Sequence, residues 1–248
     1  MSITIKNEKE LNKMRKAGKI LKDTLDLLES SVFPGQTTNN LNKIAFDYIT
    51  SQGGKPSFLN YEGFPYTICA SKNEQVVHGF CDDEPLKEGD IISIDCGVIW
   101  EGYHSDAART FPVGNVSAEN LRLIEVTKQS FFEGIKDIKA GSRLGHISHR
   151  IQAHLEKNGY GVVRELVGHG IGTHLHEDPM VPNYGKYNSG IVLEEGMTLA
   201  IEPMSTLGNK NVYLEDNDWT VSTQDGLPSA HYENTVLITK DGVEILTL

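Results

Sequence analysis

The chain has 248 residues, of which 38% are hydrophobic and 23% are charged, and its formal net charge at pH 7 is −11. This composition is typical of a globular protein with a substantial core, and the acidic balance argues against a specific nucleic-acid partner, which would need a concentrated basic surface. We find neither an apolar run long enough to cross a membrane nor a signal-peptide segment after the charged start, so we expect a soluble, cytoplasmic protein with no membrane partner.

The N-terminal part contains two helical patterns followed by strand-like runs. Asn7 and Glu10 form a helix-capping pattern, after which apolar residues recur at helical spacing, at Leu11, Met14, Leu21, Leu25 and Leu28. A turn at Phe33-Pro34-Gly35 leads to a second apolar face that predicts another helix, and Gly53-Gly54 ends it. The runs TICAS, QVVHG and EGDIISID then read as strands.

The same order returns in the second half of the chain. Ser117 caps a predicted helix through about Lys136, Ser142 opens another, and Gly159 ends it before the strand-like run GVVRELV. Residues 34–54 align without a gap on residues 140–160, and EGDIISID, which ends at Asp95, aligns on EGMTLAIE, which ends at Glu202. A chance match is the alternative, because such units are common.

From this repeat we predict one α+β domain over residues 1–248, built from two similar halves at about 1–114 and 115–248. Each half would contribute helices and part of a shared, curved, largely antiparallel sheet. The halves would pack about a pseudo-twofold axis, and acids at matching positions would meet near that axis.

Asp95 and Asp106 stand where a buried strand and its partner are expected. A tight turn around Trp100-Glu101-Gly102 would place the two carboxylates on one face, opposite or diagonal to each other, whereas a three-residue loop would separate them. An ionised carboxylate in an apolar interior must be neutralised, paired or bound to a metal. Two carboxylates this close would favour a cation between them.

Three further residues in the second half have similar surroundings. His169 lies between two glycines in GHGIG, and Glu202 and Glu233 lie in LAIEPM and AHYENTVLI, among apolar and strand-forming residues. Taken singly, each acid has an ordinary explanation, at an exposed strand end or hydrogen-bonded to backbone amides. Taken together, four carboxylates and one imidazole favour two divalent ions and a hydrolytic site.

Other chemistry has little support in the sequence. The GHGIG segment is followed by Pro179 before a helix could begin, so it is neither a dinucleotide fingerprint nor a phosphate loop, and no G-x-S-x-G or HExxH motif occurs. Cys69, Cys81 and Cys96 form no CxxC pair, which argues against a disulfide framework or a zinc finger.

The five residues in their contexts, SIDCG, YHSDAART, GHGIG, AIEPM and AHYENT, resemble the metal-ligand set of type I methionine aminopeptidases over essentially the whole chain. The resemblance implies the pita-bread fold and two divalent ions, Co, Mn, Fe or Zn. Asp95 would bind one ion, Asp106 and Glu233 would bridge both, and His169 and Glu202 would complete the other. A metal-bridging water or hydroxide would attack the carbonyl of the initiator methionine, with Glu202 as the proton shuttle.

Two further histidines match the family's catalytic positions. By resemblance His78 contacts the substrate amide and His176 donates to the carbonyl oxygen of the bond that is cut. From the sequence alone the favoured interpretation is a core histidine on the QVVHG strand for His78 and an exposed residue for His176, and the resemblance favours catalysis for both. His174 is expected to be a surface residue or a neighbour of the site.

The resemblance also implies an apolar pocket for the methionine side chain, and aromatic rings and a thiol suit a thioether. Its wall would include Phe58, Tyr61, Phe64, Cys69, Leu175 and Trp219. Ordinary core packing is the alternative for these residues. Several bacterial relatives have cysteine or tyrosine where this chain has Phe58 and Phe64, and the family frequently has histidine where this chain has Asn234.

The implied substrates are the N-termini of nascent polypeptides with a small second residue, after deformylation. The chain leaves no room for the N-terminal zinc-binding extension or the helical insertion of other family branches, so the bacterial short form is favoured. A transient ribosome contact and a monomeric state are further expectations. An aminopeptidase P or prolidase, which shares the five ligands but usually has a large N-terminal domain, and a non-catalytic binding protein of the same fold are the alternatives.

Overall fold

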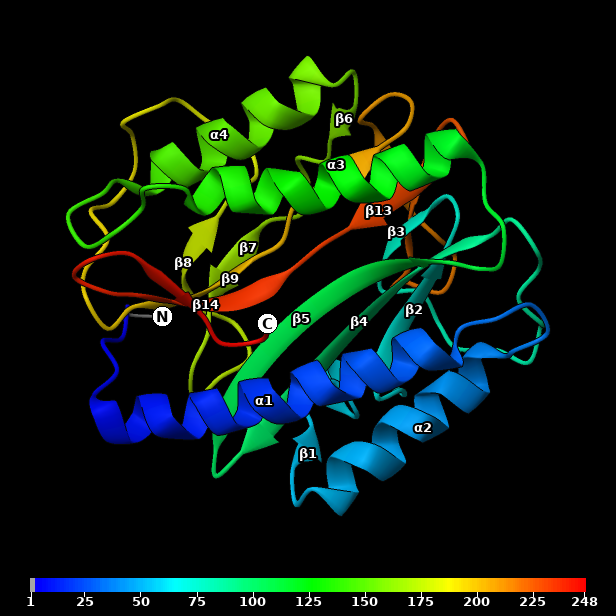
Figure 1. The fold of residues 1–248 in the computed structure, drawn as a ribbon, viewed down its shortest axis with the longest axis horizontal. Helices are drawn as coiled ribbons and strands as arrows, with labels where there is room; N and C mark the ends of the chain where they lie inside the picture. Colours follow the sequence, from blue (N-terminus) through cyan, green and yellow to red (C-terminus); the bar gives the residue numbers. More distant parts are fainter. Residues whose placement is uncertain (1–2) are drawn as a thin grey trace.

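The computed structural model describes residues 3–248, and its first part folds into two helices and the strands that they cover (Figure 1). The elements are α1 (Glu8–Ser31), α2 (Thr38–Ser51), β1 (Lys55–Pro56), the 3-10 helix η1 (Tyr61–Gly63), β2 (Ile68–Lys72), β3 (Gln75–Val77), β4 (Ile91–Trp100) and β5 (Tyr103–Pro112). The predicted helices and strands of this part are confirmed.

Helix α1 begins where the sequence predicts. The side chain of Asn7 accepts hydrogen bonds from the backbone N–H groups of Lys9 and Glu10, and the carboxylate of Glu10 accepts one from the N–H of Asn7 at 2.7 Å. This reciprocal capping box satisfies N–H groups that have no partner within the helix. The predicted apolar face is buried at Leu11, Met14, Leu21, Leu25 and Leu28.

The second part repeats the pattern of helices followed by strands. Its elements are α3 (Ala118–Ile135), α4 (Leu144–Lys157), β6 (Gly161–Val162), β7 (Gly168–Gly170), β8 (Glu177–Val181), β9 (Thr198–Ile201), β10 (Met204–Thr206), β11 (Val212–Leu214), β12 (Val221–Thr223), β13 (Ser229–His231), β14 (Asn234–Ile238) and β15 (Val243–Ile245). Ser117 caps α3 as predicted, by accepting a hydrogen bond from the N–H of Asn120.

Two details of the sequence prediction are wrong in this part. Helix α4 has Arg143 at its N-cap, because the hydroxyl of Ser142 instead accepts a hydrogen bond from the N–H of Lys139 in the preceding turn. The run GVVRELV forms a strand only at Gly161–Val162. The backbone N–H of Val163 donates one further hydrogen bond to the carbonyl oxygen of Met204, and the pairing with β10 ends there.

Within residues 3–248 the strand pairings are antiparallel, in agreement with the predicted, largely antiparallel arrangement, but they form four hydrogen-bonded sheets rather than one shared sheet. The two larger sheets have the orders β1-β4-β2, with β5 paired to β4, and β15-β14-β9-β7-β8. They meet where β5 approaches β14, in the middle of Figure 1. There the hydroxyl of Thr235 accepts from the N–H of Asp106 at 2.8 Å and donates to its carbonyl oxygen at 2.9 Å. One threonine side chain therefore joins the two sheets.

The backbone repeats at the spacing that the sequence alignment predicts. Helix α4 begins and ends 106 residues after α2. An isolated bridge between Thr37 and Pro85 has a counterpart between Arg143 and Val192. The repeat is therefore present both in the sequence and in the backbone pairing. The proposed boundary between the halves near residue 114 stays a prediction.

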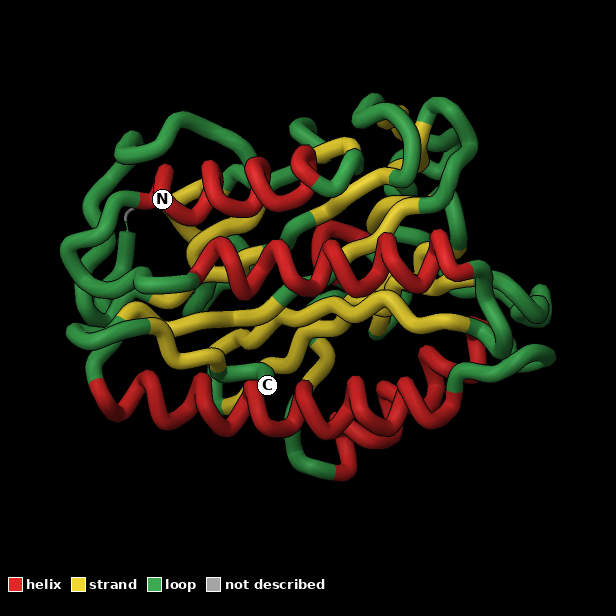
Figure 2. The backbone as a smooth tube through the Cα atoms, turned by 45° about the horizontal axis from the view of Figure 1, so that its top comes forward, coloured by secondary structure: helices red, strands yellow, loops and turns green. Residues whose placement is uncertain are grey.

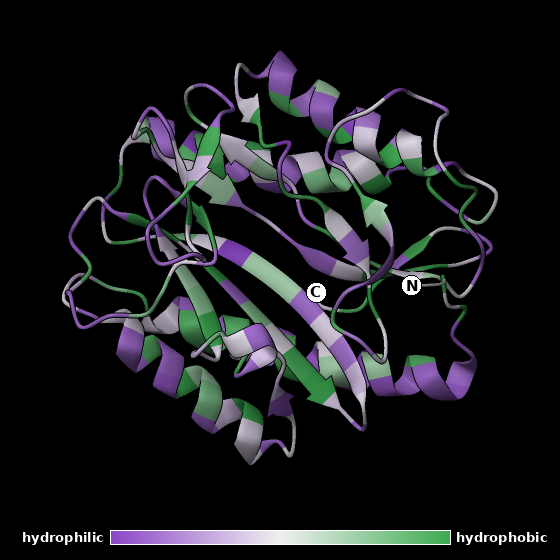
Figure 3. Ribbon diagram, turned by 180° about the vertical axis from the view of Figure 1, so that it is seen from behind, coloured by the Kyte–Doolittle hydropathy of each residue, from purple (hydrophilic) through white to green (hydrophobic). Residues whose placement is uncertain are grey.

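Among residues 3–248 the core has one hydrophobic cluster mainly in each part, and a third and a fourth cluster between the two parts. In Figures 1 and 2 helices α1 and α2 lie on one side and α3 and α4 on the other, with strands between. Figure 3 shows strongly hydrophobic segments in several strands, and mixed hydropathy in the long central strand and along the helices. The third cluster draws on both parts: Leu11, Met14, Phe58, Phe64, Cys69, Ile171, Leu175, Leu237 and Leu246. None of the helices within residues 3–248 is long and apolar enough to cross a membrane.

Candidate metal centre and active site

The β4–β5 hairpin brings Asp95 and Asp106 to one face. Its loop has two residues, Glu101 and Gly102, both with positive φ (45° and 82°), which is the conformation that matches the twist of paired strands. Asp106 pairs with Gly97 rather than Asp95, so the two carboxylates are diagonal neighbours on the same face. The predicted tight turn is confirmed.

His169 reaches the same place from β7, which pairs with β8 and β9. A Cβ atom on Gly170 would lie 2.1 Å from the carbonyl oxygen of Asp178, and one on Gly168 would lie 2.4 Å from that of Ala200. The glycines on both sides of His169 therefore allow neighbouring strands to approach closely, and the imidazole is held by the bond between its Nδ1 and the carbonyl oxygen of Gly170 at 2.9 Å.

Glu202 and Glu233 complete the cluster at the ends of β9 and β14. The Nε2 atom of His169 lies 3.9 Å from Oδ2 of Asp106 and 3.9 Å from Oε1 of Glu202. One ligand atom from each of Asp106, His169 and Glu233 lies within 4.8 Å of the others. The structure thus brings together all five residues that the sequence singled out, and they line one cavity.

The carboxylates of this cluster are held in an environment that disfavours their charged forms. Burial raises the pKa of Asp95 to about 7, and burial together with neighbouring carboxylates raises the pKa values of Asp106, Glu202 and Glu233 well above their usual range. Burial and the nearby His176 lower the pKa of His169 to about 3, so its imidazole is neutral at pH 7.

The buried cluster fits a divalent metal ion. Within residues 3–248, Oδ1 of Asp95, Oδ1 of Asp106 and Oε1 of Glu233 are buried without a hydrogen-bond partner. A bound cation would satisfy these oxygens and offset the repulsion between the carboxylates. Carboxylate oxygens with a neutral imidazole are ligands that divalent metals accept.

His231 belongs to the same cluster and was missed by the sequence prediction. Only 1% of the residue is exposed, and its Nε2 atom lies 3.7 Å from Oε2 of Glu202 and 3.6 Å from Oε2 of Glu233. The signal that could have found it is its position two residues before Glu233, because alternate residues of an extended segment share a face.

The cluster lies at the end of a cavity of about 170 Å³. All six predicted pocket residues line it: Phe58, Tyr61, Phe64, Cys69, Leu175 and Trp219. The rings of Phe64 and Trp219 meet edge to face, with their centroids 5.1 Å apart. The cavity therefore has an aromatic wall and a polar end.

The two predicted catalytic histidines border this cavity. His78 follows the end of β3 with a left-handed φ of 58°, and burial, with the nearby His176, lowers its pKa to about 4. His176 lies at the exposed rim, where its Nδ1 atom is 2.9 Å from the hydroxyl of Tyr61. His174 is exposed at the surface, as expected, although its backbone N–H donates to Glu177.

Asn234, where the family frequently has histidine, holds the side chain of Arg109 next to the backbone of Glu233. Its Oδ1 atom accepts hydrogen bonds from Arg109 at 2.7 Å and from the hydroxyl of Thr247 at 2.9 Å. Arg109 also donates to the backbone carbonyl oxygen of Glu233. The amide side chain therefore holds the arginine that fixes the backbone of Glu233.

Comparisons with known proteins agree with this geometry. The sequence pattern of metallopeptidase family M24 matches residues 12–240. A methionine aminopeptidase from Clostridium perfringens is 55% identical over 246 residues, with 99% of each chain covered. The crystal structure of methionine aminopeptidase from Rickettsia prowazekii matches with a TM-score of 0.98 at 45% identity over 100% of both chains. A prolidase from Pyrococcus furiosus is similar in fold alone, with a TM-score of 0.81, 23% identity and 65% of its chain covered.

Proposed function

The chain belongs to metallopeptidase family M24, and we infer that it has type I methionine aminopeptidase activity, the hydrolytic removal of methionine from the N-termini of proteins and peptides. The observation that carries this function is the cluster of buried carboxylates at the polar end of an aromatic cavity of about 170 Å³. A small apolar cavity that ends at a metal-binding cluster suits an enzyme that recognises one apolar residue and cuts the bond beside it.

We assign two divalent ions, Mn, Fe, Co or Zn, to the five clustered side chains, because four carboxylates balance the charge of two such ions. Asp95 would hold one ion, Asp106 and Glu233 would bridge both, and His169 and Glu202 would complete the other. When bound, the ions would supply an activated water and polarise the carbonyl of the first peptide bond.

His176 is positioned to donate a hydrogen bond to the developing oxyanion. We assign the phenolic O–H of Tyr61 as the donor to Nδ1 of His176, 2.9 Å away, which requires an unprotonated Nδ1. The proton of the neutral ring then resides on Nε2, which is free to donate to the carbonyl oxygen. A single donor of this kind contributes about 3 kcal/mol to stabilisation of a transition state.

Glu202 and His78 handle the leaving amide. Glu202 lines the cavity together with His78 and His169, so its carboxylate is placed to take up a proton and release it to the departing nitrogen. His78 would contact the same amide, because it lines the cavity together with Glu202.

The methionine side chain would occupy the aromatic end of the cavity. Phe58, Tyr61, Phe64, Leu175 and Trp219 supply apolar and aromatic surface, and the thiol of Cys69 suits contact with a thioether. Burial raises the pKa of Cys69 well above its usual range, so it contributes a neutral thiol.

The residues after methionine would leave through a second, more open cavity. This cavity has a volume of about 400 Å³ and shares His78, His169, His176 and Glu202 with the first. These four residues therefore lie between the two spaces, at the expected position of the bond that is cut. A small second residue, nascent chains after deformylation, a transient ribosome contact, a monomeric state and a cytoplasmic location stay predictions.

The proposed function is tested by measuring free methionine released from Met-Ala-Ser by the metal-loaded protein, with Gly-Pro and other X-Pro peptides as competing substrates. We expect methionine release, its loss on chelator treatment, and its return when metal is added back. The variant Glu202→Gln should remain folded and lose turnover. Cleavage of X-Pro bonds without methionine release would instead favour a prolidase-like hydrolase.

A further inference from the structure

His231 is a buried imidazole in the acidic cluster that the five-residue ligand set leaves without a role. It ends β13, only 1% of it is exposed, and neither ring nitrogen has a hydrogen-bond partner within residues 3–248. A buried polar side chain without a partner costs free energy, so its presence at this position requires an explanation.

His231 and His169 each lie in a group of three potential metal ligands. Ligand atoms of Asp106, His169 and Glu233 lie within 4.8 Å of one another, and so do those of Asp95, His231 and Glu233. The cluster therefore contains two groups, each with one aspartate and one histidine, and the groups share Glu233.

Glu202 lies between the two imidazoles. Its Oε1 atom is 3.9 Å from Nε2 of His169, and its Oε2 atom is 3.7 Å from Nε2 of His231. The two histidines thus face different oxygens of one carboxylate.

We propose that His231 is a sixth ligand of the metal centre, and that its Nε2 atom binds the divalent ion held by Asp95 and Glu233. This inference deepens the proposed function and rests on the metal set assigned there. Each of the two ions would then have one imidazole ligand, whereas the five-residue set gives an imidazole to only one of them.

The distances favour a shared ion over a direct hydrogen bond. Separations of 3.6 and 3.7 Å from Nε2 of His231 to the oxygens of Glu233 and Glu202 are too long for hydrogen bonds. Ligand atoms about 2.1 Å from one ion lie about 3–4 Å from each other, which matches these separations. An additional nitrogen ligand also makes the site better suited to Co or Zn than to Mn, which prefers oxygen.

Metal binding to the chelator-treated protein tests the proposal without reference to activity. Calorimetric titration with Co²⁺ and with Mn²⁺ would compare the wild type with His231→Gln and His231→Ala, and the exposed His174→Gln would serve as the matched control. We expect both His231 variants to lose about tenfold or more in affinity for one of two Co²⁺ ions, with a smaller loss for Mn²⁺. The control should bind both ions like the wild type.

Proton NMR of the Co²⁺-loaded wild type gives a second readout that does not depend on how the variants fold. Two strongly shifted, exchangeable imidazole N–H resonances are expected if His169 and His231 both bind metal, and His231→Gln should retain one. A single resonance in the wild type would overturn the proposal. So would full recovery of Co²⁺ affinity by glutamine after its loss in His231→Ala, because an amide can replace a hydrogen-bond donor but is a poor substitute for an imidazole ligand.

Metal binding, the imidazole resonances and methionine release together distinguish a wrong sixth ligand from a wrong function. A wild type that binds two ions and releases methionine but shows one imidazole resonance would remove His231 from the ligand set and leave the proposed function intact. A wild type that binds no divalent ion and releases no methionine would contradict the proposed function itself.

Discussion

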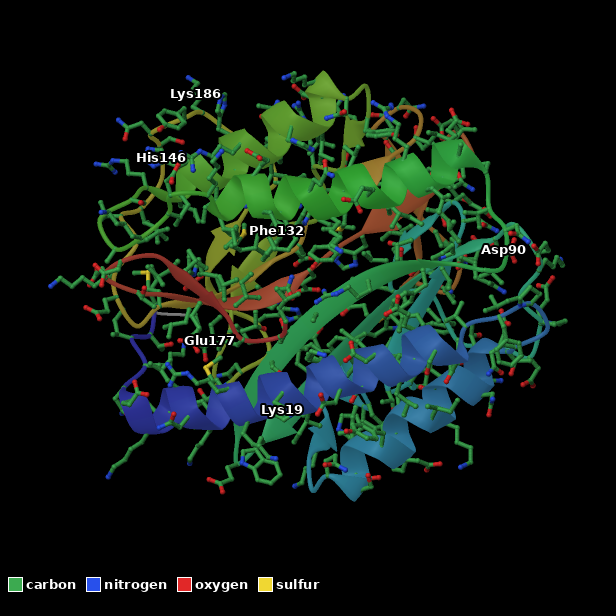
Figure 4. All side chains as sticks on the ribbon, viewed as in Figure 1. Lys19, Asp90, Phe132, His146, Glu177 and Lys186 are labelled. Carbon is green, nitrogen blue, oxygen red and sulfur yellow. The ribbon has the colours of Figure 1, made fainter. Side chains whose placement is uncertain are left out.

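A buried ion pair between Lys6 and Glu177 connects the N-terminal segment to the loop that carries His176. Their Nζ and Oε2 atoms are 2.7 Å apart, and their side chains are only 5% and 3% exposed. Glu177 also accepts hydrogen bonds from the hydroxyl of Thr4 at 2.6 Å and from the N–H of His174 at 3.2 Å (Glu177 is labelled in Figure 4). We predict that Lys6→Met destabilises the protein and displaces this loop.

The magnitude follows from the burial of the pair. Removing one partner of a buried ion pair costs about 3–5 kcal/mol, because the other charge remains in a poorly solvated site. Thr4 and the backbone of His174 would still bind Glu177, so we expect the lower end, about 3 kcal/mol. The exposed pair between Lys43 and Asp47 offers a matched control, and Lys43→Met should cost about 0.5 kcal/mol or less.

Denaturant unfolding of the wild type and both variants measures these free energies, and their pH dependence tests the cause. Burial raises the pKa of Glu177, but hydrogen bonds from Lys6 and Thr4 outweigh it and hold this pKa below its usual value. A lowered pKa contributes stability above the pKa of the unfolded chain, about 4.3, and that stability is lost as pH falls through the folded-state pKa. The difference between wild type and Lys6→Met should therefore shrink below about pH 4.

Two results would refute this reasoning. One is a cost for Lys6→Met no larger than that for Lys43→Met, which would mean that the pair behaves as an exposed one. The other is a difference that is constant with pH. The double variant Lys6→Met/Glu177→Leu removes both charges, and we expect it to be more stable than Lys6→Met alone.

Three further predictions concern the metal, the rim histidine and the packing of the C-terminal segment. Burial raises the pKa of Asp95 to about 7, above the value of about 3.9 in an unfolded chain, so the chelator-treated protein should lose stability as pH rises from about 4 to about 7. Thermal melts should show a Co²⁺-induced gain that grows with pH over this range, and an equal gain at every pH would contradict this. Tyr61→Phe should lower kcat for methionine release about tenfold with little change in KM, because it removes the hydrogen bond that keeps the proton of His176 on Nε2. An unchanged kcat would mean that Tyr61 does not orient His176. Gly18→Ala should cost about 1–3 kcal/mol in unfolding measurements, because its Cβ atom would lie 2.1 Å from the carbonyl oxygen of Leu246, and a neutral effect would show that the segment can move.

Local signals predicted most of the fold. The Asn7 and Glu10 pattern located the start of α1, and the turn at Glu101 fixed the relation of Asp95 to Asp106, because each depends on residues close in sequence. Ser142 failed as a cap because it bonds to the preceding turn, and a capping residue type does not reveal which of two local partners it chooses.

Contacts between distant segments were beyond the sequence patterns. Lys6 and Glu177 are 171 positions apart, and no periodicity connects them. The segment AHYENT predicts Glu233 as a ligand but not His231, because a single histidine beside a strand is usually an ordinary core residue. Only the arrangement in space shows that its Nε2 atom faces the oxygens of Glu202 and Glu233.

The repeat explains why so many acids can occupy one buried place. Asp95 and Asp106 come from the first predicted half, Glu202 and Glu233 come from the second, and Thr235 joins the two sheets at the point where these acids meet. Packing the two parts together places all four carboxylates in one buried cluster, where burial and their mutual repulsion make their charges unfavourable. A divalent ion bound there relieves a repulsion that the packing itself creates, so part of its binding free energy stabilises the contact between the halves.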